Sequence, residues 1–231
     1  EDYQRVPLKN LISTSYDLSR IRSHPTGGST GQMMDIHFDD YFDDVRAASQ
    51  YRTYLANGYR FTDTIANLQA RLPKPHVLNR FGLNKRVGIP FNLSLNEQLS
   101  LLEDVQPQVL EGYPSRIRLI AQIMNDRKVN SLSPRLILTN SETLTDTARK
   151  QITAAFGVNP INVYECWEFG TVAWECPARE GLHINADHVI LEVISEGREA
   201  PAGESGEIVG TNFFNYVMPF IRFSIKDCGV K

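Results

Sequence analysis

The side chains best suited to chemistry gather in one stretch of this chain, residues 161–184. A short apolar run, residues 161–164, is typical of a buried strand. It leads directly into a polar segment, closed by Gly170, that contains Glu165, Cys166, Trp167 and Glu168. Open α/β sheets bind their ligands in loops beyond the ends of strands, so this segment is a candidate site. A tryptophan-rich core hairpin with incidental acids is the alternative that these residues leave open.

Cys176 and His183 follow closely and flank a predicted turn that could hold both side chains on one metal ion. Thiolate and imidazole are preferred zinc ligands, but a closed structural zinc site needs four ligands. Cys228 is the one cysteine that lies beyond them in the sequence, so the set is incomplete. A buried cysteine and a hydrogen-bonded histidine are the alternative interpretation.

A run of small residues, HPTGGSTG at 24–31, is a second candidate for chemistry. Glycines let the backbone approach a ligand closely, and hydroxyl groups with backbone N–H groups can surround phosphate oxygens. The run is not the phosphate loop of nucleoside triphosphatases, because no Gly-Lys-Ser/Thr follows it. A surface turn is the alternative.

Composition excludes several other functions for the chain. With 231 residues, 42% hydrophobic and 22% charged, the chain can bury a substantial core. A formal net charge of -3 without a basic stripe argues against a nucleic-acid partner. No apolar run is long enough to span a membrane, and the first residues do not have the pattern of a signal peptide. Three cysteines do not suggest a disulfide framework, so a reducing, cytoplasmic location is expected.

The elements that position these side chains follow from periodicity, capping signals and turn residues. Helices are predicted over residues 8–12, 39–57, 62–72, 94–105, 145–156 and from residue 114 to about 124. Strands are predicted over residues 77–81, 87–89, 108–110, 135–139, 161–164, 189–194, 206–211 and 220–224. The alternation up to residue 164 predicts an α/β fold, with a mostly parallel sheet flanked by helices. A smaller antiparallel or barrel-like β portion follows.

This order of elements divides the chain into three predicted parts. Residues 1–23 form a lead-in segment, residues 24–187 an α/β nucleotide-binding core, and residues 188–231 a β-rich end portion.

Four segments in this order resemble the adenylate-forming enzymes: PTGGSTG at 25–31, LILTNSETL at 136–144, VYECWEFG at 163–170 and PFIRFSIKD at 219–227. Three further segments are similar to the phenylacetate–CoA ligase and capsule-biosynthesis branch: LEGYPSRIRLIA at 110–121, WECPAREGLHI at 174–184 and GESGEIVGTNFF at 203–214. The resemblance covers the chain from about Val6 to Asp227 and implies the fold of the large N-terminal domain of such an enzyme.

The resemblance also implies roles for individual residues. The residues that would close over the β- and γ-phosphates of ATP are Gly27, Gly28, Ser29, Thr30 and Gly31. Ser141 and Glu142 would lie along the adenine, and Tyr164 would stack on its face. Glu168 would hold magnesium, and with Thr30 it is assigned to catalysis. Asp227 would accept hydrogen bonds from the ribose hydroxyls, with Arg222 nearby. Cys176 and His183 would be half of a structural zinc site, completed in relatives by a Cys-x-Cys pair after the ribose aspartate.

The implied reaction is activation of a small-molecule carboxylic acid by ATP, giving an acyl-adenylate and pyrophosphate, with coenzyme A as the expected acceptor. Such chemistry depends on positioning and on neutralising charge that develops. The alternative is a non-catalytic nucleotide- or acyl-binding relative, or a truncated domain, that acts in a larger assembly. Self-association is a further expectation, because a missing domain would leave apolar surface unpaired.

Several departures from the family pattern bear on that choice. Gln32 stands where the family has a lysine, Glu165 replaces a glycine, and Trp167 replaces a threonine and could fill part of the pocket. Lys226 replaces the glycine before the ribose aspartate. The C-terminal domain that brings the catalytic lysine in such enzymes is absent from this sequence. The expectation is therefore nucleotide binding, with very slow turnover at most.

Overall fold

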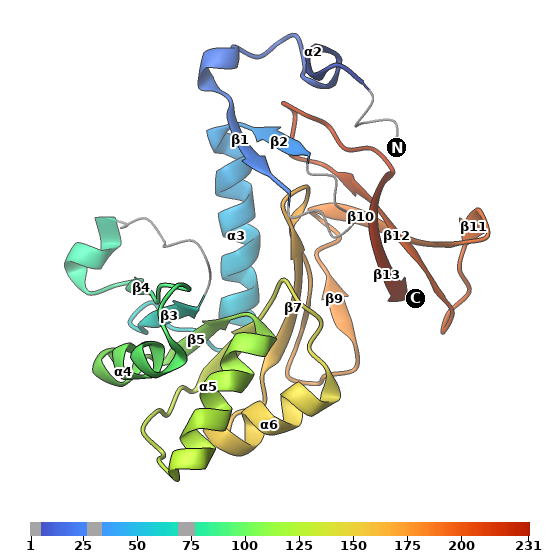
Figure 1. The fold of residues 1–231 in the computed structure, drawn as a ribbon. Helices are drawn as coiled ribbons and strands as arrows, with labels where there is room; N and C mark the ends of the chain where they lie inside the picture. Colours follow the sequence, from blue (N-terminus) through green and yellow to red (C-terminus); the bar gives the residue numbers. More distant parts are fainter. Residues whose placement is uncertain (1–5, 27–33, 69–76) are drawn as a thin grey trace. The chain divides into compact units, whose positions relative to one another are not determined.

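The structure, a computed structural model, describes residues 6–26, 34–68 and 77–231. The chain forms two compact units. Unit 1 comprises residues 1–51, 165–173 and 184–231, and unit 2 comprises residues 52–164 and 174–183. Figure 1 labels the elements of both units. The three-part division predicted from the sequence stays a prediction.

A seven-stranded sheet, in the order β4-β3-β5-β6-β7-β8-β9, contains the strands of unit 2 together with residues of β7, β8 and β9 that belong to unit 1. Its strands are β3 (Ile65–Leu68), β4 (Arg86–Gly88), β5 (Val109–Gly112), β6 (Leu136–Thr139), β7 (Ile161–Cys166), β8 (Gly170–Glu175) and β9 (Leu182–Ile184). The ladder from β4 to β7 is parallel throughout. The mostly parallel sheet predicted from the sequence is therefore confirmed.

Three helices of unit 2 pack with this sheet: α4 (Leu95–Val105), α5 (Pro114–Arg127) and α6 (Asp146–Phe156). Figure 1 shows α5 and α6 side by side. Ser94 starts α4 with the predicted capping box, in which its hydroxyl accepts from the Glu97 backbone N–H and Glu97 reaches back to the Ser94 N–H. The helices and strands share one apolar core that includes Leu110, Ile117 and Ile152.

Alternation along β5 sends Leu110 into that core and Glu111 to the opposite side of the sheet. The Glu111 carboxylate is buried and accepts hydrogen bonds from Tyr54 Oη at 2.6 Å and Asn67 Nδ2 at 2.9 Å. Arg86 Nη1 lies 3.7 Å from Glu111 Oε2. A buried carboxylate needs such partners, because its desolvation is costly.

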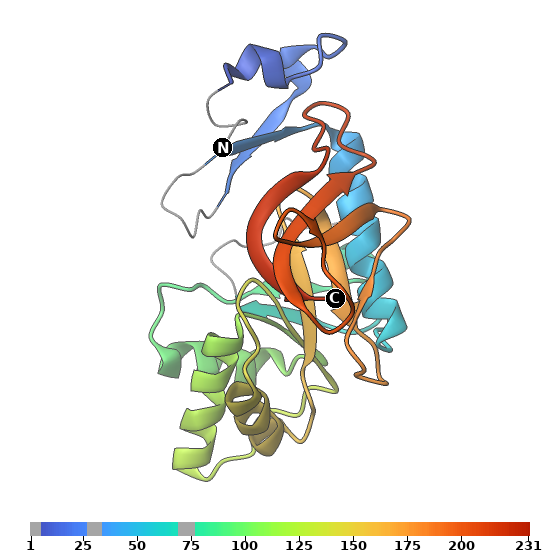
Figure 2. The ribbon, with the colours of Figure 1, turned by 90° about the vertical axis from the view of Figure 1, so that its right-hand side faces the viewer.

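Unit 1 begins with short elements: α2 (Leu8–Leu11), the 3-10 helix η1 (Leu18–Arg20), and the antiparallel pair β1 (Arg22–Pro25) and β2 (Asp35–Phe38). The long helix α3 (Asp40–Ala56) follows, with its residues after 51 in unit 2. A four-stranded antiparallel sheet completes unit 1: β11 (Arg198–Glu199), β10 (Val189–Ser195), β12 (Ser205–Asn212) and β13 (Phe223–Val230), in that order. Figure 2 shows its long strands bending strongly. The predicted antiparallel end portion is confirmed.

Three predicted elements differ from the structure. The helix predicted over residues 62–72 is wrong at Ile65–Leu68, which is a strand buried on both faces, because a short buried segment has no periodicity that distinguishes a strand from a helix. Residues 69–72 of that prediction lie outside the described residues. The strand over residues 77–81 is the 3-10 helix η2 (Val77–Phe81), closed by Gly82 with a φ of 71°. The last strand begins at Phe223 rather than residue 220, because Arg222 has a φ of 47°. Among the described helices none is both long and apolar enough to cross a bilayer.

The Glu111 cluster predicts a difference between two tyrosines. Tyr54→Phe removes a donor from a buried carboxylate, so it should lower the free energy of unfolding by about 1.5–3 kcal/mol. Tyr59→Phe is the matched control, because Tyr59 Oη donates to the neutral Asn84 Oδ1 at 3.0 Å and should cost about 1 kcal/mol. Urea denaturation measures both values. Equal losses would mean that the charge on Glu111 adds nothing to this contact.

Candidate functional site

The candidate segment forms the tip of a hairpin. The β7 strand continues through Glu165 and Cys166, and β8 begins at Gly170. Trp167, Glu168 and Phe169, here named the acid turn, connect the two strands. The segment is therefore a hairpin with its polar residues at the end, and the role of these residues in a ligand site stays a prediction.

Two side chains of unit 1 hold the backbone of the acid turn. Asn212 Nδ2 donates to the Glu168 carbonyl oxygen at 2.9 Å, and the His188 ring Nε2 contacts the Phe169 carbonyl oxygen. Both side chains are buried. Asn212 is itself fixed, because its Oδ1 accepts from the backbone N–H of Phe214 at 2.7 Å. The position of Glu168 is thus set by contacts that its own side chain does not make.

The Phe169 ring anchors the turn in an aromatic cluster. It is fully buried, with ring centroids of Phe220 and Phe223 at 6.0 and 6.5 Å. A Cβ atom added at Gly210 would lie 2.7 Å from Phe169 Cζ, closer than side-chain atoms approach each other. Gly210 on β12 therefore leaves the space that this ring occupies.

The Trp167 indole lies between a histidine and an arginine, an arrangement here named the Trp167 stack. The His24 ring is 3.4 Å away between centroids and inclined by 11°, and Arg46 Cζ lies 4.0 Å from the Trp167 ring centroid. Gly170, with a φ of 75°, makes room for Arg46, since an added Cβ would be 3.0 Å from Arg46 Cγ. The stack joins β1 and α3 to the acid turn.

Polar contacts fix the β1–β2 pair on which His24 lies. Thr26 N donates to the Met34 carbonyl oxygen at 2.8 Å, and Met34 N donates to Thr26 Oγ1 at 3.0 Å. Arg22 forms ion pairs with Asp40 at 2.7 Å and Asp43 at 3.1 Å on α3. The residues predicted to contact phosphate lie between Thr26 and Met34, outside the described residues: Gly27, Gly28, Ser29, Thr30 and Gly31.

The charges around the acid turn are unusual. Burial raises the pKa of Glu168, and the charge of Asp227 acts in the same direction, while the Cys166 thiol and Arg46 oppose them. Burial also raises the pKa of Cys166 well above its usual range, so the thiol stays protonated and donates to Glu168. Burial lowers the pKa of Arg46, and the nearby acids Asp43, Glu165 and Glu168 oppose that shift. The groups around the half-buried Glu168 therefore do not fully offset the free-energy cost of its negative charge. A bound cation would stabilise that charge.

Asp227 lies at an irregularity of β13. The register with β12 shifts between Glu207 and Val209, and Lys226 has a φ of 68°. β-bulges of this kind redirect side chains and occur near functional sites. Arg222 precedes the strand and forms an ion pair with Glu192 at 3.0 Å.

The predicted adenine contacts belong to unit 2. Ser141 is exposed with a φ of 63°, and Glu142 Oε2 accepts from the Ser115 backbone N–H at 3.1 Å, in the first turn of α5. Tyr164 is half-buried on β7. The convergence of these residues with the acid turn on one nucleotide stays a prediction.

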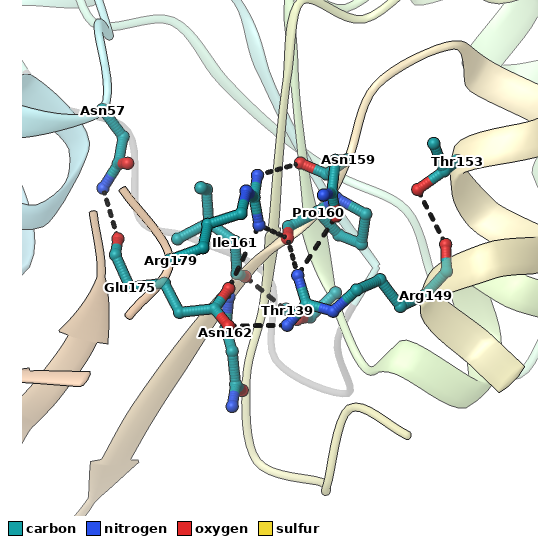
Figure 3. Close-up of polar contacts among 10 residues, drawn as sticks. All are labelled: Asn57, Thr139, Arg149, Thr153, Asn159, Pro160, Ile161, Asn162, Glu175 and Arg179. Atoms are coloured by element: carbon teal, nitrogen blue, oxygen red, sulfur yellow. Dashed lines mark hydrogen bonds and ion pairs between the residues drawn. The ribbon is translucent and has the colours of Figure 1, made fainter. Parts of the chain in front are cut away.

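The segment around Cys176 is held by Glu175, shown in Figure 3. Glu175 binds Arg149 of α6 at 2.6 Å and Arg179 at 3.2 Å, and it accepts from the Asn162 backbone N–H at 2.9 Å. His183 is exposed, with its ring 5.5 Å from the Trp174 ring. Over the described ranges, no group of three or more histidine, cysteine or acidic side chains is placed to hold a metal. Zinc at Cys176 and His183 stays a prediction.

Sequence reasoning missed the residues that support the acid turn. Arg46 reads as one more residue on an amphipathic helix, and Asn212 and His188 are remote in sequence from Glu168. His24 is the exception, because its place directly before the small residues of the run indicated a role in the site.

Comparison with known proteins places these observations in context. A phenylacetate–coenzyme A ligase from Thermus thermophilus is 31% identical over 147 residues, covering 60% of this chain and 33% of that protein. One from Pseudomonas putida is 27% identical, covering 98% of this chain and 56% of that protein. Protein CapK of Staphylococcus aureus is 28% identical, covering 87% and 49%. The chain thus spans about a third to just over half the length of these relatives. No protein-family model matches it.

The fold is also found in a solved structure. A 2-hydroxyisobutyryl-CoA ligase, in an open conformation with 2-HIB-AMP and CoA, has a TM-score of 0.76 at 17% identity, covering 99% of this chain and 56% of that one. The expected fold, that of the N-terminal domain of adenylate-forming CoA ligases, is confirmed.

The shifted pKa of Glu168 predicts how stability depends on pH. A pKa raised in the folded state means that the folded protein binds the proton more tightly, so the free energy of unfolding falls as pH rises through the raised pKa. Glu168→Gln should therefore be more stable than the wild type at pH 8, with the difference shrinking towards pH 4. Denaturation of the wild type and Glu168→Gln at several pH values across this range tests this expectation. Glu180→Gln, at an exposed position, is the control. A difference that is constant with pH would contradict the shift.

The backbone at Lys226 yields a second prediction. A non-glycine residue in the left-handed region costs roughly 1–2 kcal/mol, and the exposed ion pair of Lys226 with Glu207 offsets little of it. Lys226→Gly should raise the free energy of unfolding by about 1 kcal/mol. Lys226→Ala loses the same ion pair but keeps a Cβ atom, so a gain with alanine as large as that with glycine would contradict the explanation.

Proposed function

We propose that the chain binds magnesium-ATP and activates a carboxylic acid as its acyl-adenylate. Its similarity to phenylacetate–coenzyme A ligases and to CapK, and the fold that it shares with a CoA ligase, support this proposal. Coenzyme A would be the acceptor that completes the reaction. The setting would be cytoplasmic.

One observation supports this function most strongly. The stacking of His24 on Trp167 brings the start of the small-residue run beside the acid turn, although the two are distant in sequence. Both belong to unit 1. A polyphosphate and its divalent cation require such a meeting of a phosphate-binding segment with an acidic ligand.

The residues of the acid turn fit magnesium. Carboxylate oxygens are the ligands that this cation prefers, and burial raises the pKa of Glu168, whose carboxylate would be stabilised by a cation. Glu168 would hold the ion, which when bound supplies positive charge beside the phosphate oxygens.

The remaining roles are assigned to the chain's own residues. Residues 27–31, including Thr30, would surround the β- and γ-phosphates. Asp227 would accept hydrogen bonds from the ribose hydroxyls, with Arg222 nearby. The adenine would lie against Ser141, Glu142 and Tyr164.

In the proposed reaction, a carboxylate oxygen of the acid attacks the α-phosphorus of ATP. A new oxygen–phosphorus bond forms, the bond from the α-phosphorus to its bridging oxygen breaks, and pyrophosphate leaves. The protein contributes by holding the reactants in line and by neutralising charge. A zinc site at Cys176 and His183 would need further ligands, so no step depends on it.

A second candidate is nucleotide binding without turnover. The observation that favours it is the bulk of Trp167, which fills the position between His24 and Arg46 where the family has a threonine. Gln32 in place of a lysine also favours nucleotide binding without turnover.

Calorimetric titration with ATP and magnesium tests the shared part of both candidates. The wild-type chain should bind, and Glu168→Ala should weaken binding about tenfold or more, since a contact to a charged group is worth roughly 1.5–3 kcal/mol. Glu180→Ala, in an exposed turn, is the matched control. The absence of binding by the wild type would refute both candidates.

Pyrophosphate release distinguishes carboxylic acid activation from nucleotide binding without turnover. The chain is incubated with ATP, magnesium and a panel of aromatic, aliphatic and sugar-linked acids. Release that depends on an acid and is lost in Glu168→Ala supports catalysis. Binding without release by any acid supports the non-catalytic role.

A further inference from the structure

Asn212 uses both ends of its side-chain amide next to the acid turn. Its Oδ1 accepts from the backbone N–H groups of Phe214 at 2.7 Å and Asn215 at 3.1 Å. Its Nδ2 donates to the Glu168 carbonyl oxygen at 2.9 Å. Because two N–H donors face one atom of the amide, that atom is the oxygen, and the nitrogen is left to donate to the acid turn. The side chain is buried, so a lost hydrogen bond here would leave a polar group without a partner.

The second side chain that holds the acid turn, His188, is tied to the same end of the antiparallel sheet. Its ring contacts the Phe169 carbonyl oxygen. Val189, the next residue along β10, pairs with Asn212 on β12. In addition, the Phe213 backbone N–H donates to the His188 carbonyl oxygen at 3.3 Å. The two side chains therefore project from backbone that is paired, which limits how far the acid turn can move.

A firmly held carboxylate discriminates between divalent cations. Magnesium requires near-ideal octahedral geometry with ligand distances of about 2.0–2.1 Å, whereas calcium accepts varied geometries at about 2.3–2.6 Å. A ligand with a fixed backbone keeps the geometry that magnesium needs, and a ligand that can move suits calcium as well. Selectivity between the two cations therefore reports how firmly the acid turn holds Glu168.

We propose that Asn212 is a positioning residue that makes the Glu168 site selective for magnesium over calcium, because its hydrogen bond to the Glu168 carbonyl oxygen fixes the acid turn. This inference rests on the proposed function, in which Glu168 holds the cation. His188 supports the same turn at the next carbonyl oxygen. In this role neither supporting side chain contacts the cation.

Asn212→Asp separates the two functions of the amide. An aspartate keeps an oxygen that can accept from the Phe214 and Asn215 N–H groups. Its second oxygen, when ionised, cannot donate to the Glu168 carbonyl oxygen and repels it instead. The variant therefore retains the contacts within the loop and loses the contact with the acid turn.

Asn215→Asp is the matched control in the same loop. Asn215 is also buried, and its Oδ1 accepts from the Met218 backbone N–H at 3.2 Å. Its Nδ2 donates to the His37 carbonyl oxygen on β2 at 3.0 Å. This variant adds the same charge and loses the same kind of donor, but the contact that it breaks is with β2 and not with the acid turn.

Calorimetric titrations with magnesium-ATP and with calcium-ATP measure the selectivity. The wild type should bind the magnesium complex more tightly. Asn212→Asp should weaken binding of magnesium-ATP about tenfold and binding of calcium-ATP less than about threefold. Asn215→Asp should leave the ratio of the two affinities unchanged. Partial unfolding lowers both affinities by the same factor, so the ratio reports the geometry of the site rather than stability.

The direction of the change distinguishes positioning from a direct effect of the new charge. A carboxylate at position 212 that attracted the cation through space would tighten binding of both complexes. Displacement of Glu168 weakens binding instead. His188→Ala removes the other support without adding a charge, and it should lower the selectivity in the same direction. This second variant keeps the test decisive if Asn212→Asp does not fold.

Three results would overturn the inference. They are a wild type without preference for magnesium-ATP, an unchanged affinity ratio in Asn212→Asp or in His188→Ala, and an equal change of the ratio in Asn215→Asp. In each case, binding of magnesium-ATP by the wild type would leave the proposed function standing. If the wild type binds neither complex, the inference and the proposed function both fail.

Discussion

The arrangement of unit 1 depends on the fixed backbone of the acid turn. Two buried side chains, Asn212 and His188, contact consecutive carbonyl oxygens, and the Phe169 ring is enclosed where Gly210 leaves space. None of these contacts involves the Glu168 carboxylate, which is half-buried and near Asp227. The surrounding fold thus holds a carboxylate at a position where burial disfavours its charge. Such carboxylates are typical of functional sites.

Hydrophobic patterning predicted most of the fold. The strands β5, β6 and β7 and the helices α4 and α6 were predicted because apolar periodicity and capping residues agree locally, as at Ser94 and Thr145. The prediction failed at Ile65–Leu68, where all four residues are buried and periodicity carries no information about the type of element. It failed again at Val77–Phe81, where a short turn has no periodic signal.

The candidate site was predicted in part. Glu168 was identified through the motif that it occupies, and its partners were not, because tertiary contacts bring Asn212, His188 and Arg46 to it. Lys226 shows the converse. Its left-handed backbone gives a physical reason for the glycine that the family resemblance implies at this position, and the sequence alone did not indicate that the lysine has this conformation.

The central claim is that the small-residue run and the acid turn form one site for a metal-bound triphosphate. The most direct measurement is a crystal structure of the chain with a non-hydrolysable ATP analogue and manganese, located by its anomalous signal. The account predicts manganese on the Glu168 carboxylate, with the β- and γ-phosphates contacting residues 27–31. Manganese and phosphates bound away from Glu168 would contradict it.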